Sequence, residues 1–267
     1  MTIRKSILAV SIAAALVALA VQARAGGDKV AFPEGFDRGT LYATVDRYDI
    51  KQFRELYASP GVVEAVRKGQ AIPSGAVLTL VQYRAKTDDK GSPVKGADGR
   101  FIKDGVVGFG VMERRTGWGT EYPDSLRNGE WEYQAFTADK TPNPKANLTA
   151  CFQCHKPHET QDFVMSLARL SGTAPGAPVA KRSGPGIVGI AEFLFGPEKI
   201  AVKVGDVITW TNADDSPHQV TVQGETTLRT PVLLKGQSTA VVFNDSGSYD
   251  YICGLHPNMK GKIEVTR

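Results

Sequence analysis

The sequence is poor in the residue types that usually carry chemistry. Its 267 residues include only three cysteines, four histidines and four methionines. An odd number of cysteines excludes a fully paired disulfide framework, so at least one of them has another role. The chain also lacks the biased compositions of collagen, coiled coils and disordered proteins, since 42% hydrophobic and 22% charged residues are ordinary for a globular protein. The few reactive residues are therefore where function should be sought.

The chain also has almost no net charge once the predicted signal peptide is removed. Arg4 and Lys5 precede a short uncharged run over 6–21, and an Ala-Arg-Ala pattern ends at Ala25. This arrangement is typical of a secretory signal peptide, predicted over 1–25, and an uncleaved anchor helix is the alternative. Cleavage removes three basic residues, so the formal charge of +4 becomes 29 basic against 28 acidic residues. We expect a protein exported to a bacterial periplasm, with no stable membrane span after cleavage and no nucleic-acid partner.

A stretch rich in Gly, Pro and Ala divides the chain. Residues 171–186 read SGTAPGAPVAKRSGPG and show no apolar periodicity. Such a composition cannot bury enough apolar surface to offset its ordering entropy, which favours a flexible linker over a surface loop within one domain. The sequence therefore predicts a first domain over 26–170 and a second over 187–267.

Short strands separated by turn signals fill the second domain. They are expected at 200–204, 207–211, 219–222, 238–243, 249–252 and 262–265. Because several short strands follow one another at this spacing, the second domain is predicted to be an all-β sandwich.

Four residues with metal-binding side chains stand out in this second domain: His218, Cys253, His256 and Met259. They include its only cysteine, its only two histidines and its only methionine. Two imidazoles and a thiolate with a weak axial thioether make a blue-copper electron-transfer site. Zinc is disfavoured because methionine is a poor zinc ligand. The alternative without a metal, a buried cysteine beside surface histidines, would not explain why all four ligand types occur together.

Two longer runs carry a family resemblance. IAVKVGDVITWTNADDSPHQV (200–220) and YDYICGLHPNMKGKIEV (249–265) resemble the cupredoxins, close to the amicyanin and plastocyanin group. The resemblance implies a type 1 mononuclear copper and a redox partner protein. Gln219 departs from the pattern, because many small cupredoxins have Asn beside the first histidine ligand. The departure concerns the hydrogen bonding around His218 rather than the copper.

The first domain contains the run Cys151-Phe152-Gln153-Cys154-His155. This C-x-x-C-H pattern is typical of c-type haem attachment, with two thioethers to the porphyrin and the histidine as axial iron ligand. A thioredoxin-like redox pair is one alternative, but it needs a βαβ context. A disulfide between Cys151 and Cys154 is the other.

The remainder of the first domain is predicted to be α+β. Segments rich in β-branched and aromatic residues predict strands at 41–47, 76–84, 106–115 and 131–137. Short helices are expected at 61–68 and 162–170. We therefore expect a mostly antiparallel sheet with short helices, and the haem at a C-terminal helical segment.

Four segments in order are similar to the cytochrome P-460 family, which includes the cytochrome c-prime-beta branch. They are FRELYASP (53–60), IPSGAVLTL (72–80), GVVGFGVMERRTG (105–117) and CFQCHKP (151–157). The resemblance implies that His155 is the proximal ligand. It also implies that the opposite iron face is open to small nitrogen compounds or gases.

The resemblance also bears on the distal side of the haem. Hydroxylamine-oxidising members carry a lysine joined to the porphyrin where this chain has Leu80, whose side chain has no nucleophilic nitrogen. This difference favours the cytochrome c-prime-beta branch, whose apolar pocket binds nitric oxide. Arg54 matches a family element as a structural or pocket-edge residue, and Glu113 is the candidate for a distal acid.

Two functions remain open at this point. The first is a periplasmic electron-transfer protein with one covalent haem and one type 1 copper, in which the haem also binds nitric oxide. The second is an oxidoreductase acting on hydroxylamine, nitric oxide or peroxide, with the copper domain as electron relay. Either one leaves room for an oligomer formed through the haem domain.

Overall fold

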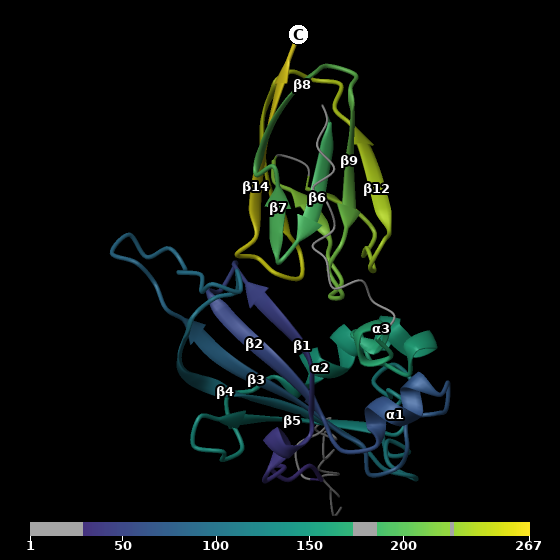
Figure 1. The fold of residues 1–267 in the computed structure, drawn as a ribbon. Coiled ribbons are helices and arrows are strands. Elements are labelled where there is room, and N and C mark those ends of the chain that lie inside the picture. Colours follow the sequence, from purple (N-terminus) through teal and green to yellow (C-terminus); the bar gives the residue numbers. More distant parts are fainter. Residues whose placement is uncertain (1–28, 173–185, 225–226) are drawn as a thin grey trace, which may run out of the picture.

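The computed structural model describes residues 29–172, 186–224 and 227–267. The signal peptide predicted over 1–25 and most of the linker predicted over 171–186 lie outside these ranges. The described residues form an N-terminal part (29–172) and a C-terminal part (186–267), each with sheets of its own (Figure 1). Within the described ranges, no helix combines the length and the apolar character needed to cross a membrane.

A five-stranded antiparallel sheet forms the N-terminal part, with its strands in chain order. The strands are β1 (Thr40–Arg47), β2 (Gln52–Ala58), β3 (Val77–Ala85), β4 (Lys103–Arg114) and β5 (Trp131–Thr137). The helical segments are η1 (Phe36–Arg38), α1 (Val62–Arg67), α2 (Leu148–His155), η2 (Lys156–Gln161) and α3 (Leu167–Leu170). The predicted antiparallel sheet with short helices is confirmed.

Both faces of this sheet are covered. On one face, Leu78, Met112 and Tyr133 occupy paired positions on β3, β4 and β5 and pack with Phe152 of α2. We call this the helix face of the sheet. On the other face, the aromatic rings of β4 and β5 pack with the N-terminal segment before β1. Of the five strands, only β2 was not predicted, because the adjacent charged residues Arg54 and Glu55 interrupt its apolar and aromatic residues.

The helix predictions hold in part. The helix expected at 61–68 is present as α1. The helix expected at 162–170 is wrong in its first half, because Asp162 and Phe163 have φ angles of 50° and 59°, in the left-handed region. These angles interrupt the helix, and only Leu167–Leu170 is α-helical.

Two sheets pack face to face in the C-terminal part, which confirms the predicted all-β sandwich. Their strand orders are β11-β10-β13-β14-β8 and β12-β9-β6-β7. The strands are β6 (Ile187–Ala191), β7 (Leu194–Gly196), β8 (Lys199–Lys203), β9 (Val207–Asn212), β10 (Val220–Val222), β11 (Leu228–Arg229), β12 (Ser238–Val242), β13 (Gly247–Cys253) and β14 (Lys260–Thr266). All six predicted strands are observed, whereas β6, β7 and β11 were not predicted.

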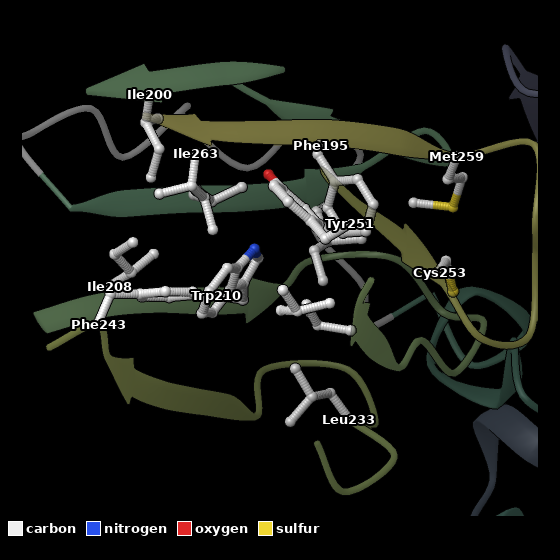
Figure 2. Close-up of a cluster of buried hydrophobic side chains, with 14 of the residues drawn as sticks. Phe195, Ile200, Ile208, Trp210, Leu233, Phe243, Tyr251, Cys253, Met259 and Ile263 are labelled. Carbon is white, nitrogen blue, oxygen red and sulfur yellow. The ribbon is translucent and has the colours of Figure 1, made fainter. Parts of the chain in front are cut away.

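A single apolar core lies between these two sheets. Trp210 and Tyr251 are fully buried at its centre, with their ring centroids 5.6 Å apart in an edge-to-face arrangement. Cys253 and Met259 belong to the same cluster, and Figure 2 shows both sulfur-bearing side chains at one end of it. The core therefore reaches the end of the sandwich where the candidate metal ligands lie.

Neighbouring residues of β9 offer a test of this core. Ile208 is fully buried, whereas Val207 is 54% exposed. We expect Ile208→Ala to lower the free energy of unfolding of the C-terminal part by about 2–5 kcal/mol, because it leaves a cavity. Val207→Ala, the matched control, should change it by about 0.5 kcal/mol or less. Urea unfolding followed by tryptophan fluorescence measures both, and equal effects would contradict the packing described.

Candidate metal centres

Three potential ligands converge at the core end of the C-terminal sandwich. His218 is fully buried just before β10 and forms a bridge with Leu233, while Cys253 is the buried last residue of β13. His256 follows in the turn that leads into β14 and is half-buried. Among the described residues, these three are the set of His, Cys, Asp or Glu side chains close enough together to hold one metal ion.

The donor atoms of this set form a nearly equilateral triangle. Cys253 Sγ lies 3.6 Å from His218 Nδ1 and 3.6 Å from His256 Nδ1, and the two Nδ1 atoms are 3.3 Å apart. The centre of such a triangle is about 2 Å from each corner, which is a normal distance from a metal ion to its nitrogen or sulfur ligand. The residues present therefore fit a single trigonally bound ion.

The surroundings of Cys253 favour its thiolate form. Burial opposes ionisation, but the hydrogen bonds from His218, His256 and the Gln219 amide outweigh it and lower the Cys253 pKa to about 5. The Gln219 backbone nitrogen lies 3.5 Å from the sulfur. A thiolate is the form in which cysteine binds metal ions.

Asp214 orients the first of the two histidines. Its Oδ2 accepts a hydrogen bond of 2.9 Å from His218 Nε2, which leaves Nδ1 free to face Cys253. A carboxylate that holds the outer ring nitrogen fixes the tautomer and the ring orientation of a metal-binding histidine. Asp214 was not among the predicted site residues, and its position four residues before His218 was the available clue.

Met259 and Gln219 complete the surroundings of the triangle. Met259 is 1% exposed, and its backbone oxygen accepts a hydrogen bond from Cys253 N at 3.1 Å. The Gln219 side chain, the departure noted in the sequence, donates to the Thr230 carbonyl at 2.9 Å. Gln219 thus supports the loop from both its backbone and its side chain.

In the N-terminal part, helix α2 carries Cys151, Cys154 and His155. Positions i, i+3 and i+4 share one face of a helix. Phe152 anchors the helix: it is fully buried, with its ring centroid 4.7 Å from that of Tyr133. Burial raises the pKa of Cys151 to about 11 and also raises that of Cys154. A thioredoxin-like pair needs a βαβ context, and since all strands of the N-terminal sheet pair antiparallel, this alternative is not supported.

The His155 imidazole is oriented through its Nδ1 atom. Nδ1 lies 2.7 Å from the Phe163 carbonyl oxygen, and since a carbonyl can only accept, Nδ1 carries the proton. Burial lowers the His155 pKa to about 4, so the ring is neutral at physiological pH. The left-handed conformation of Phe163, which broke the predicted helix, directs this carbonyl. A neutral imidazole with its Nε2 lone pair available suits an iron ligand.

A basic group lies beside the haem-attachment motif. Arg54 on β2 donates only to Gln52 Oε1, at 3.2 and 3.3 Å, and no ion pair of Arg54 occurs among the described residues. Burial, followed by the charge of Arg47, lowers the Arg54 pKa to about 9. A partly buried guanidinium without a carboxylate partner suits an anionic group such as a haem propionate.

An apolar strip runs across the helix face of the sheet. Leu56, Leu80, Gly110 and Ala135 occupy paired positions on β2 to β5 and are all half-buried. They share the face of Leu78 and Met112, because side chains two apart in a strand point to the same side. Small and apolar side chains beside the C-x-x-C-H helix fit a flat macrocycle.

Glu113, by contrast, lies on the opposite face of the sheet. It is adjacent to Met112 on β4, so its side chain points away from α2. Its carboxylate pairs with Arg115 at 2.6 Å. Glu113 therefore lies on the face of the sheet opposite to α2.

Comparisons with known proteins assign both parts. Residues 33–166 match the family model of cytochrome P-460, and residues 187–266 match that of copper binding proteins of the plastocyanin/azurin family. Amicyanin of Paracoccus denitrificans is 36% identical over 102 residues, which are 37% of this chain and 78% of amicyanin. Amicyanin-alpha of Methylorubrum extorquens is 38% identical over 113 residues, 39% of this chain and 95% of its own. A solved Cu(I) form of an amicyanin variant is 36% identical, with a TM-score of 0.29, and covers 34% of this chain and 93% of its own.

These matches define a redox protein with a c-type haem and a type 1 copper. The chain belongs to the cytochrome P-460 family and carries a cupredoxin domain at its C-terminal end.

Proposed function

We propose that this protein transfers single electrons between a haem and a copper ion held in one chain. The observation that carries this proposal is the triangle of donor atoms from His218, Cys253 and His256, in the same chain as the C-x-x-C-H helix. His218, Cys253 and His256 would hold the copper, with the Met259 thioether as weak axial ligand. A copper ion in such a set changes oxidation state by one electron.

Cys151 and Cys154 would attach the haem through thioether bonds, and His155 would bind its iron through Nε2. The chain's own contribution is to keep that imidazole neutral and oriented through the Phe163 carbonyl. Arg54 would pair with a propionate. The haem supplies one-electron chemistry and a coordination site for a small ligand.

The apolar strip suggests what the haem meets on its distal side. We propose that Leu80 lines that side and that the haem binds nitric oxide, because no acid or base stands beside Leu80 on the paired positions Leu56, Gly110 and Ala135. General acid–base chemistry needs such a group within hydrogen-bond reach of the substrate. The electron-transfer function is thereby favoured over an oxidoreductase acting on hydroxylamine, nitric oxide or peroxide.

The setting we propose is the periplasm, with the signal peptide over 1–25 removed, a haem domain over 26–170, a linker over 171–186 and a copper domain over 187–267. The match to the copper-binding family supports a periplasmic redox partner protein as the external electron donor or acceptor.

The optical spectrum of the reduced protein, with and without nitric oxide or hydroxylamine, tests this function. Nitric oxide should shift the haem Soret band, and hydroxylamine should be left unconsumed. Peptide mass analysis should find no lysine joined to the porphyrin. Steady consumption of hydroxylamine, or a lysine adduct, would favour the enzymatic alternative and overturn the interpretation of Leu80.

A further inference from the structure

The turn between β6 and β7 has an unusual sequence for its shape. Its two central residues, Glu192 and Phe193, have φ angles of 53° and 58°. A two-residue hairpin turn with both residues in the left-handed region normally contains Asn or Gly, and a bulky Phe there is strained. Such strain persists only where surrounding contacts impose it, and it points to a functional placement of the side chain.

One carboxylate imposes this turn. Asp214 accepts hydrogen bonds from Glu192 N at 2.7 Å and from Phe193 N at 2.9 Å. The same carboxylate holds His218 Nε2. The position of the Phe193 ring is therefore tied to the position of the first copper-ligand candidate.

The Phe193 ring lies against the copper-ligand candidates and also against the N-terminal part. It is 3% exposed, and its centroid lies 5.3 Å from that of His218 and 4.9 Å from that of His256. The guanidinium of Arg47, the last residue of β1, lies over the ring with its Cζ 3.6 Å from the centroid. A cation over an aromatic face is attracted by the ring quadrupole. The ring thus contacts the copper ligands and the N-terminal part at the same time.

Arg47 is itself held in place. Its guanidinium is bound by Asp49 through two hydrogen bonds of 2.6 and 2.8 Å. Because Arg47 is the last residue of β1 and the Phe193 ring lies against both candidate copper imidazoles, β1, Arg47, Phe193 and these imidazoles form a continuous series.

Other contacts surround this series and join the two parts of the protein. Val45 of β1 packs against the core cluster of the sandwich, and Tyr48 N donates to Glu192 O at 3.5 Å. Arg100 lies 3.6 Å from the Glu192 carboxylate, and Arg169 pairs with Asp215. Figure 1 shows the β6–β7 end of the sandwich directed at the tip of β1 and at α3. Packing and charge pairs from separate segments define one orientation better than a linker alone.

From these contacts we infer that Phe193 is a positioning residue. It docks the copper-ligand loops on the haem part in one orientation, through its contacts with Arg47 and the rest of β1. The inference rests on the proposed function, because the docked contact is where an electron crosses between the centres. In that exchange the haem iron and the copper ion change oxidation state by one in opposite directions, and no atom or proton moves. Since electron tunnelling weakens steeply with distance, a fixed contact speeds the exchange compared with a linker that samples many orientations.

The test uses the full-length protein carrying both cofactors and compares it with three variants. Phe193→Ala removes the ring, and Val45→Asp disturbs the same contact from the haem side, at a residue that is not a copper-ligand candidate. Leu194→Ala is the matched control, since Leu194 is the neighbouring residue and is 42% exposed. Retained copper and haem spectra show that each variant is folded and loaded.

Two readouts are measured. Hydrogen exchange of the segment 45–48, which includes the Tyr48 amide bonded across the contact, reports docking without any redox step. Flash-photolysis kinetics at several protein concentrations report the first-order electron exchange within the molecule. We expect Phe193→Ala and Val45→Asp to speed the hydrogen exchange and to slow the electron exchange about tenfold each, with Leu194→Ala like the wild type.

Two results would overturn the inference. One is equal hydrogen exchange at 45–48 in the wild type and Phe193→Ala, which would mean that the ring docks nothing. The other is loss of that protection with an unchanged electron-exchange rate, which would mean that the linker suffices. A wild type that shows no concentration-independent electron exchange would instead contradict the proposed function, and the hydrogen-exchange readout would still decide whether Phe193 docks the two parts.

Discussion

Cys253→Ser is expected to abolish the intense visible band of the copper-loaded protein completely. That band arises from charge transfer between a cysteine thiolate and copper, and serine keeps the size of the side chain without supplying a thiolate. The lowered pKa of Cys253, about 5, means that the wild-type thiolate is present across the physiological pH range. Visible absorption after copper loading measures the effect, and the copper hyperfine lines in electron paramagnetic resonance of the oxidised protein give a second measure.

The matched control lies in the same chain. Changing Cys151 and Cys154 to serine removes both other thiols and should leave the copper band intact, because these residues lie on α2, outside the triangle of donor atoms. The same background also removes the covalent haem that overlaps the copper absorption. A blue colour that survives Cys253→Ser would show that the thiolate comes from elsewhere.

The copper-ligand set could be predicted from the sequence because its members are rare. The C-terminal part has one cysteine and two histidines, and the short spacing of Cys253 and His256 brings them to one turn. The partner of His218 could not be found in the same way. Asp214 stands in a run that is typical of a loop, and its hydrogen bonds to Glu192, Phe193 and His218 exist only after distant segments have come together.

The β6–β7 hairpin escaped prediction for a related reason. Local rules predict a two-residue hairpin from Asn or Gly, and Glu192-Phe193 offers neither. A carboxylate 22 positions from Glu192 holds this turn, so the stabilising contact is tertiary. Local pattern and spacing therefore did not predict Phe193, the residue that contacts both parts.

The sheet of the N-terminal part shows how strand register limits prediction of the face that a residue occupies. Leu80 could be placed on a strand, and strand parity with Leu78 then puts it on the helix face. Glu113 was also placed on a strand, but which face it occupies depends on the register of β4 against β3 and β5. That register pairs Glu113 with Val77 and Glu132, away from the haem-attachment helix.

The double change of Cys151 and Cys154 to serine is expected to eliminate covalently bound haem. Both thiols project from one short helix that Phe152 fixes against the sheet, so they can reach the same porphyrin. Haem staining after denaturing electrophoresis, together with the mass of the intact protein, measures the loss. Each single variant should retain haem through one thioether.

Cys253→Ser is the matched control for this second prediction and should keep its covalent haem, since Cys253 lies in the sandwich core. Haem that stays covalently bound in the double variant would place the attachment on another residue. A wild-type protein matured with haem but found with a Cys151–Cys154 disulfide would instead favour the structural alternative. Because Cys151, Cys154 and the oriented His155 imidazole share one face of α2, the thioether pair is the expected result.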